Sequence, residues 1–63
     1  MKKSIEAARV RAQKFSAMYP NNMVYVFDKK GKKAIISVSD WIWRERILEG
    51  WSPVALYKAG KEV

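Results

Sequence analysis

The stretch MVYVFDKKGKKAIISV, residues 23–38, constrains the fold of this chain more than any other. Two runs rich in β-branched and aromatic residues flank the sequence DKKGK, and such runs around a glycine-containing turn predict a β-hairpin. Gly31 is expected at the left-handed position of a type I turn followed by a bulge, which sets Asp28 opposite Lys32. This register decides which side chains share a face of the hairpin.

The two faces of the predicted hairpin differ in composition. In the expected register Val26 pairs with Ala34, and the aliphatic face consists of Val24, Val26, Ala34, Ile36 and Val38. The opposite face consists of Met23, Tyr25, Phe27, Lys33, Ile35 and Ser37. The aliphatic face suits a core, whereas aromatic rings beside a lysine suit base stacking in a single-strand binder or burial in a homodimer. A register that differs by one residue would exchange the faces.

A first helix is expected over about residues 5–18. Ser4 is a favourable cap, Glu6 lies in the first turn where negative charge is stabilising, and Pro20 disfavours helical geometry at Tyr19. Apolar positions recur at helical spacing at Ile5, Ala8, Ala12, Phe15 and Tyr19. A second row about 100° away is mostly basic and consists of Lys3, Ala7, Arg11, Lys14 and Met18. One side of this helix is therefore expected to pack, and the neighbouring side to carry positive charge.

All three tryptophans of the chain lie in SDWIWRERILEGW, residues 39–51. Ser39 and Asp40 are typical of a helix start and Gly50 of a helix end, so a second helix is expected over about 40–49. At about 100° per residue, Trp41 and Trp43 diverge by about 200° and cannot face the same core.

Two apolar rows follow from this helical spacing. One row consists of Trp43, Ile47 and Trp51, and the other of Trp41 and Leu48. The row that contains Trp43 is our candidate for the core, docked on the aliphatic sheet face. The row that contains Trp41 is expected to pack against the first helix or to stay exposed at an interface, where Arg44 beside it would bind a partner's carboxylate or phosphate.

A short strand is expected over about 54–58, with Pro53 at a position that strand starts tolerate. The element order is then α-β-β-α-β in one small domain, residues 1–63. The predicted fold class is α+β, a two-layer domain with a three-stranded, mainly antiparallel sheet and both helices on one face. In our preferred order the third strand lies beside the first, and the second helix forms a right-handed crossover. Because the chain has 63 residues and no cysteine, its stability must come from packing, helped in one alternative by oligomerisation.

The formal net charge of +7 is concentrated in the first half of the chain. Residues 1–33 contain nine basic and two acidic residues, whereas residues 34–63 contain four of each. Concentrated positive charge attracts polyanions, so the sequence predicts nucleic-acid binding through phosphates with little sequence readout. The residues expected to make these contacts are Lys29, Lys30, Lys32, Lys33, Arg11 and Lys14. The simpler alternative is that the charge serves solubility alone.

Catalysis is not expected, because the residues that most often perform it are missing. The chain has no histidine and no cysteine, so it lacks the commonest general base, the thiolate nucleophile and the usual zinc and haem ligands. No glycine-rich phosphate loop surrounds Gly31. We therefore expect a protein that is not an enzyme and has no cofactor, no metal and no small-molecule substrate.

The alternative function is protein–protein interaction, including homodimer formation, with no role in nucleic-acid binding. Its surface would consist of Tyr25, Phe27, Trp41 and Arg44. Membrane attachment is not expected, because the apolar stripe of the first helix is rich in alanine and would bury little area. The N-terminal segment carries charge where a signal peptide is apolar, and a cytoplasmic location is expected.

Overall fold

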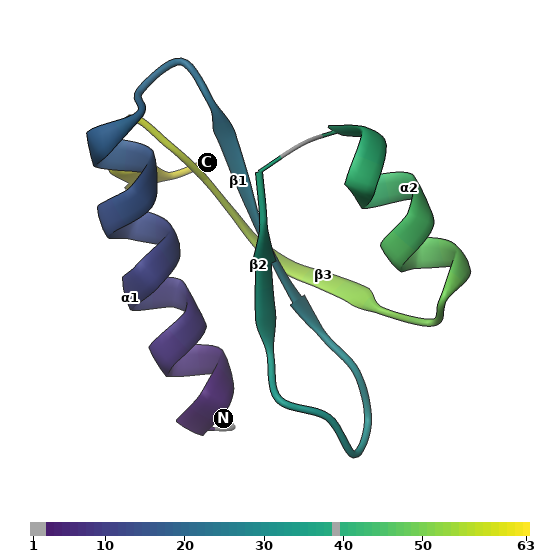
Figure 1. The fold of residues 1–63 in the computed structure, drawn as a ribbon. Helices are drawn as coiled ribbons and strands as arrows, with labels where there is room; N and C mark the ends of the chain where they lie inside the picture. Colours follow the sequence, from purple (N-terminus) through teal and green to yellow (C-terminus); the bar gives the residue numbers. More distant parts are fainter. Residues whose placement is uncertain (1–2, 39) are drawn as a thin grey trace.

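The computed structural model describes the backbone of residues 3–38 and 40–63, and the side chains of the same residues except those at positions 40 and 41. The elements in chain order are α1 (Lys3–Met18), β1 (Met23–Asp28), β2 (Ile35–Ser37), α2 (Asp40–Leu48), β3 (Ser52–Lys58) and β4 (Lys61–Glu62) (Figure 1). The expected order α-β-β-α-β is present, and a short additional strand follows it. The predicted cap, Ser4, lies inside α1 rather than at its start.

The strands form one sheet in the order β2-β1-β3-β4, and every neighbouring pair is antiparallel. The third strand therefore lies beside the first, as expected, and α2 connects two strands that flank β1. The expectation of three strands is wrong, because the chain reverses after β3 and pairs once more. Ala59 and Gly60 have positive φ angles of 53° and 82°, the pattern of a two-residue type I′ turn, and Lys58 pairs with Lys61 across it.

The two helices lie on opposite sides of the sheet (Figure 1), so the expectation that both cover one face is wrong. Val24 and Val26 of β1 belong to the core that includes Ala8 of α1. Tyr25, which points to the other face because side chains alternate along a strand, contacts the ring of Trp43 in α2. Both faces of β1 are apolar, and each needs its own helix to exclude water. The domain therefore has three layers, helix, sheet and helix.

The core lies between α1 and the aliphatic face of the sheet. Its buried members are Ala8, Ala12, Val24, Val26, Ala34 and Tyr57, and the partly buried members around them are Ile5, Phe15, Ile36 and Ala55. Two alanines in the centre of the helix stripe let the helix backbone approach the sheet closely. Tyr19, the last member of the predicted stripe, is 50% exposed, so the packed part of the stripe ends before it.

The pairing of β1 with β2 differs from the expected register by two residues. Val26 pairs with Ile36 rather than with Ala34, and the turn is closed by a hydrogen bond from the Lys32 N–H to the Lys29 carbonyl oxygen at 3.0 Å. Gly31 has a φ of 78°, as the left-handed position requires. Because side chains alternate with a period of two, a shift of two residues keeps the aliphatic residues on one face. The core side of Val24, Val26, Ala34 and Ile36 is therefore confirmed. The predictions for the two ends are wrong: Val38 is 38% exposed, and Lys33 lines a cleft with α1 instead of lying on the aromatic face. Both residues lie outside β2, where strand alternation no longer sets the direction of a side chain.

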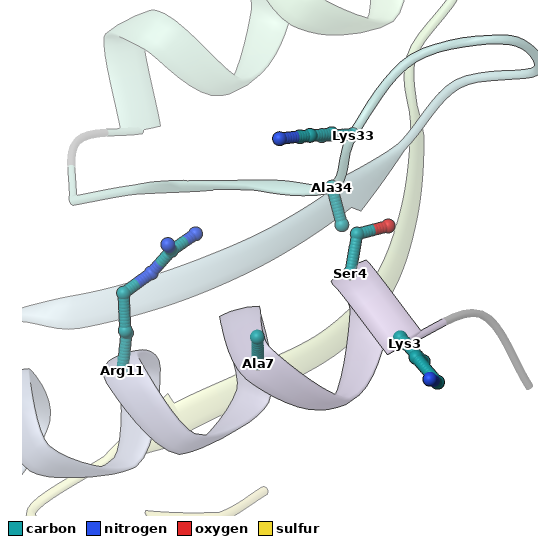
Figure 2. A pocket seen from close by; sticks show the side chains of 6 residues that line it. All are labelled: Lys3, Ser4, Ala7, Arg11, Lys33 and Ala34. Atoms are coloured by element: carbon teal, nitrogen blue, oxygen red, sulfur yellow. The ribbon is translucent and has the colours of Figure 1, made fainter.

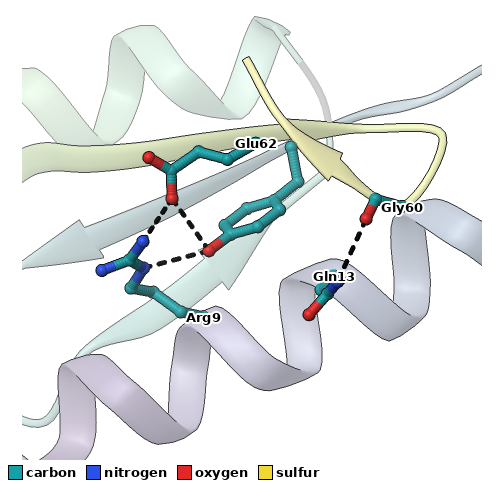
Figure 3. Close-up of polar contacts among 5 residues, drawn as sticks. Arg9, Gln13, Gly60 and Glu62 are labelled. Carbon is teal, nitrogen blue, oxygen red and sulfur yellow. Dashed lines mark hydrogen bonds and ion pairs between the residues drawn. The ribbon is translucent and has the colours of Figure 1, made fainter.

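A polar network fastens the hairpin of β3 and β4 to α1 (Figure 3). Arg9 Nε donates a hydrogen bond to the Tyr57 hydroxyl at 3.0 Å, and its guanidinium pairs with Glu62. These hydrogen bonds to Tyr57 and Glu62 raise the pKa of Arg9 above its ordinary value. Farther along α1, the Gly60 N–H donates to Ser16 Oγ at 3.0 Å. The end of the chain is thus held on the same helix that forms the core.

Candidate nucleic-acid interface

A cleft of about 340 Å³ lies between the N-terminal half of α1 and the segment that leads into β2 (Figure 2). Its lining residues are Lys3, Ser4, Ala7, Arg11, Lys33 and Ala34. The small side chains of Ser4, Ala7 and Ala34 leave the space between helix and strand open. Arg11 and Lys33 border this space and Lys3 lies at its end (Figure 2), so the cleft has a small, mostly apolar floor and cations at its rim.

The cations of the cleft come from two separate parts of the chain. In Figure 2, Arg11 extends from α1 toward β2, and Lys33 extends from the segment that precedes β2. Lys3, in the first described turn of α1, points outward at the end of the cleft. The loop between β1 and β2 projects at the same end of the molecule as the start of α1 (Figure 1). Packing of the helix on the hairpin therefore brings charges together that are distant in sequence.

These cations are not neutralised by neighbouring carboxylates. Glu62 pairs with Arg9 and Glu49 with Arg46, and within residues 3–38 and 40–63 no ion pair involves Lys3, Arg11 or Lys33. Unpaired positive charges around one concave surface repel one another and produce a positive potential there. A bound anion would reduce this repulsion. The electrostatics of the cleft therefore favour a polyanionic ligand.

Five of the six predicted phosphate-binding residues are exposed, and two of them, Arg11 and Lys33, line this cleft. We define the basic face as these five together with Lys3: Lys3, Arg11, Lys14, Lys30, Lys32 and Lys33, all exposed. Lys3 was missed as a contact residue, although it belongs to the same helical row as Arg11 and Lys14. The signal that identifies it was therefore present in the sequence, and the structure adds that Lys3 lines the same cleft as Arg11 and Lys33.

Lys29, the sixth predicted residue, has a different role. Its Nζ donates a hydrogen bond to the carbonyl oxygen of Glu49 at 2.7 Å and lies 5.7 Å from the ring centroid of Trp51. A cation is favourable at the C-terminal end of a helix, where carbonyl groups lack partners within the helix. Lys29 thus ties the hairpin to the end of α2 and is not part of the basic face.

The aromatic side of the sheet is covered rather than open. Phe27 is 0% exposed, and the Tyr25 ring lies 6.1 Å from that of Phe27 and 6.4 Å from that of Trp43, between centroids. The expectation that Phe27 contributes to an accessible interaction surface is therefore wrong, because α2 packs on this face. Of the other residues predicted for that surface, the side chain of Trp41 lies outside the described residues, and Arg44 is exposed.

The tryptophan row of α2 rests on the aromatic face of the sheet, not on the aliphatic face that we expected. Trp43 and Trp51 are both partly buried, and Trp43 contacts Tyr25. Ile47, the middle member of the row, is 37% exposed. The row therefore forms the edge of the contact between α2 and the sheet. It does not pack on the aliphatic face because α1 covers that face.

Other kinds of site receive no support in the part of the chain that the structure describes. There, no three His, Cys, Asp or Glu residues gather as a metal site would require. None of the helices described is long and apolar enough to cross a membrane. No family model, no curated protein and no solved structure matches this chain. The geometry and charge of the basic face are therefore the features of this protein that indicate a function.

Proposed function

We propose that this protein is a non-catalytic module that binds nucleic acid through the phosphate backbone. The observation that carries the proposal is the cleft where Arg11 of α1 and Lys33 of the hairpin loop meet without neutralising carboxylates. A guanidinium group can hold a phosphate with two hydrogen bonds, and an ammonium group adds charge with little demand on geometry. Two of the other four cations, Lys30 and Lys32, lie on an exposed loop, and contacts with phosphates carry little sequence information.

Binding to labelled oligonucleotides at about 0.05 M and about 0.2 M salt tests this proposal, because release of counterions makes phosphate binding strongly dependent on salt. Fluorescence anisotropy is a suitable readout. We expect measurable affinity at the lower salt concentration and a loss of several orders of magnitude at the higher one if most of the basic face is used. Absence of binding at the lower concentration would contradict the proposal.

A pair of matched double variants separates the basic face from net charge. Arg11→Glu with Lys33→Glu reverses two charges at the cleft, and Lys58→Glu with Lys61→Glu reverses two charges at the turn between β3 and β4. The first variant should abolish binding, whereas the second should weaken it only through the change in net charge. Equal losses in both variants would mean that binding is not located at the basic face.

A second candidate function, association with a protein or with another copy of the chain, is favoured by the outer side of α2. Leu48 is 87% exposed there, and with Trp43, Arg44 and Ile47 it lines a shallow cleft of about 330 Å³. Light scattering after gel filtration over a range of concentrations tests self-association. A dimer that Leu48→Lys dissociates without loss of folding would support this candidate, and a monomer at all concentrations would exclude the homodimer.

A cytoplasmic location belongs to the same proposal. A chain without cysteine needs no oxidising compartment for its stability. Localisation of a fluorescently tagged full chain in cells is the direct measurement, and accumulation outside the cytoplasm would contradict this part of the proposal.

A further inference from the structure

Among the side chains that the structure describes, the aromatic cluster of Tyr25, Phe27 and Trp43 does not line the basic cleft. Proteins that bind single strands combine a basic groove with aromatic rings on which successive bases stack. The basic cleft is lined by no aromatic residue. Phe27 is fully buried, and Tyr25 lies between Phe27 and Trp43 on the side of the sheet that α2 covers. The aromatic residues that seemed suited to stacking are therefore not available beside the cations.

Tyr19 is the remaining aromatic residue that lies near α1 and is half exposed. It follows the C-terminal end of the helix and packs on Phe15, with 4.8 Å between ring centroids. It lies five residues beyond Lys14, the last cation of the helix row, and Phe15 covers part of its ring. One ring at the far end of the basic face does not provide a stacking surface along it.

The cations of the basic face form two groups, which we call limbs. One lies along a helix and the other on a short loop. The helix limb consists of Lys3, Arg11 and Lys14 along α1, and the loop limb consists of Lys30, Lys32 and Lys33 between β1 and β2. With a rise of about 1.5 Å per residue, the helix limb is about 16 Å long. Because α1 is held on the sheet by a packed core, the spacing of this limb is set before any ligand binds.

A rigid array of charges matches a ligand whose phosphates are also held in place. Duplex DNA presents one charge per about 1.7 Å of its axis, about twice the axial density of one strand, and its backbone does not need to be ordered on binding. A flexible single strand would have to be ordered on the basic face without the stacking energy of about 1–3 kcal/mol per base that compensates for this in single-strand binders.

We propose that the basic face binds duplex nucleic acid in preference to single strands, through backbone contacts alone. This inference rests on the proposed function and specifies its ligand. Each of the two limbs contacts phosphates of the duplex, and no base is stacked on the protein. Removal of a cation from either limb reduces the dependence of binding on salt by about 0.9 in the log–log slope for duplex DNA.

The experiment compares a labelled DNA duplex with each of its two strands at the same length and low salt. We expect about tenfold or tighter binding to the duplex. Tyr19→Ala is expected to leave the affinities for both ligands unchanged, whereas Arg11→Gln and Lys33→Gln each weaken duplex binding and reduce its salt dependence. Circular dichroism melts of every variant verify that the fold is retained.

The possible results distinguish failure of the duplex preference from failure of the proposed function. Equal or tighter binding to the single strands, or loss of single-strand binding in Tyr19→Ala, would overturn the duplex preference while nucleic-acid binding itself remained. A duplex affinity unaltered by both Arg11→Gln and Lys33→Gln would overturn the role of the two limbs. Absence of binding to all three ligands would overturn the proposed function together with this inference.

Discussion

The two sides of the sheet are packed in different ways. On the side of α1, fully buried alanines and valines form a continuous core, and hydrogen bonds fasten the last hairpin to the helix. On the side of α2, the described helix residues 42–48 are partly buried or exposed, and Leu48 is almost entirely in solvent. Small residues, Ala8 and Ala12, face the sheet from α1, whereas the rings of Tyr25, Phe27 and Trp43 form the contact on the side of α2. The cations on α1, which we propose bind phosphates, therefore lie on the helix with the more buried packing.

Among the substitutions that test this difference between the two sides of the sheet, Phe27→Ala is expected to lower the free energy of unfolding most. Phe27 is the one fully buried large side chain on the α2 side among the described residues, and truncation of such a residue costs about 3–5 kcal/mol. A domain of this size has a total stability of about 3–9 kcal/mol, so partial or complete unfolding at 25 °C is the expected result. Urea unfolding followed by circular dichroism measures it.

Leu48→Ala is the control for Phe27→Ala, since it removes an apolar side chain from the solvent side of α2. It should change stability by less than about 0.5 kcal/mol. If Phe27→Ala is equally mild, α2 does not form a packed layer and the difference between the two sides of the sheet is larger than we describe.

A smaller effect is expected from Ala12→Leu, which tests the close approach of α1 to the sheet. Ala12 is fully buried, and additional methyl groups at a packed contact cost about 1–3 kcal/mol through displaced side chains and backbone. Ala7→Leu is the matched control, because Ala7 is exposed on the same helix and leucine is nearly as good a helix former as alanine. Similar stabilities of the two variants in urea unfolding would show that α1 has room to move.

The smallest effect is expected from Lys29→Met, which keeps the apolar stem of the side chain and removes its charge. Loss of the contacts with the Glu49 carbonyl oxygen and the Trp51 ring should lower stability by about 0.5–1 kcal/mol. Lys30→Met, in the same loop but exposed, should leave stability unchanged and weaken nucleic-acid binding more than Lys29→Met does. If Lys30→Met lowered stability more and Lys29→Met weakened nucleic-acid binding more, Lys29 would belong to the basic face.

Much of the fold follows from local pattern. The core face of the hairpin was predicted correctly for Val24, Val26, Ala34 and Ile36 although the register was shifted by two residues, because alternation with a period of two tolerates an even shift. It failed for Lys33 and Val38, which lie outside the strand. The helix α1 and its basic row follow from a period of 3.6 residues. The strand β4 was missed because its turn places Ala59 at a φ of 53°, a conformation that residues with a Cβ atom rarely adopt.

The sequence by itself determined which residues share a face of α1 and of β1, and that all the excess positive charge lies in residues 1–33. Only the tertiary structure decided that α1 and α2 cover opposite faces of the sheet, that Phe27 is buried, and that Lys29 binds the end of α2. The physical reason is the separation along the chain over which each effect acts. Periodicity is set by neighbouring residues, whereas the helix that covers a given sheet face, and the partner of a given side chain, depend on contacts between segments far apart in the sequence.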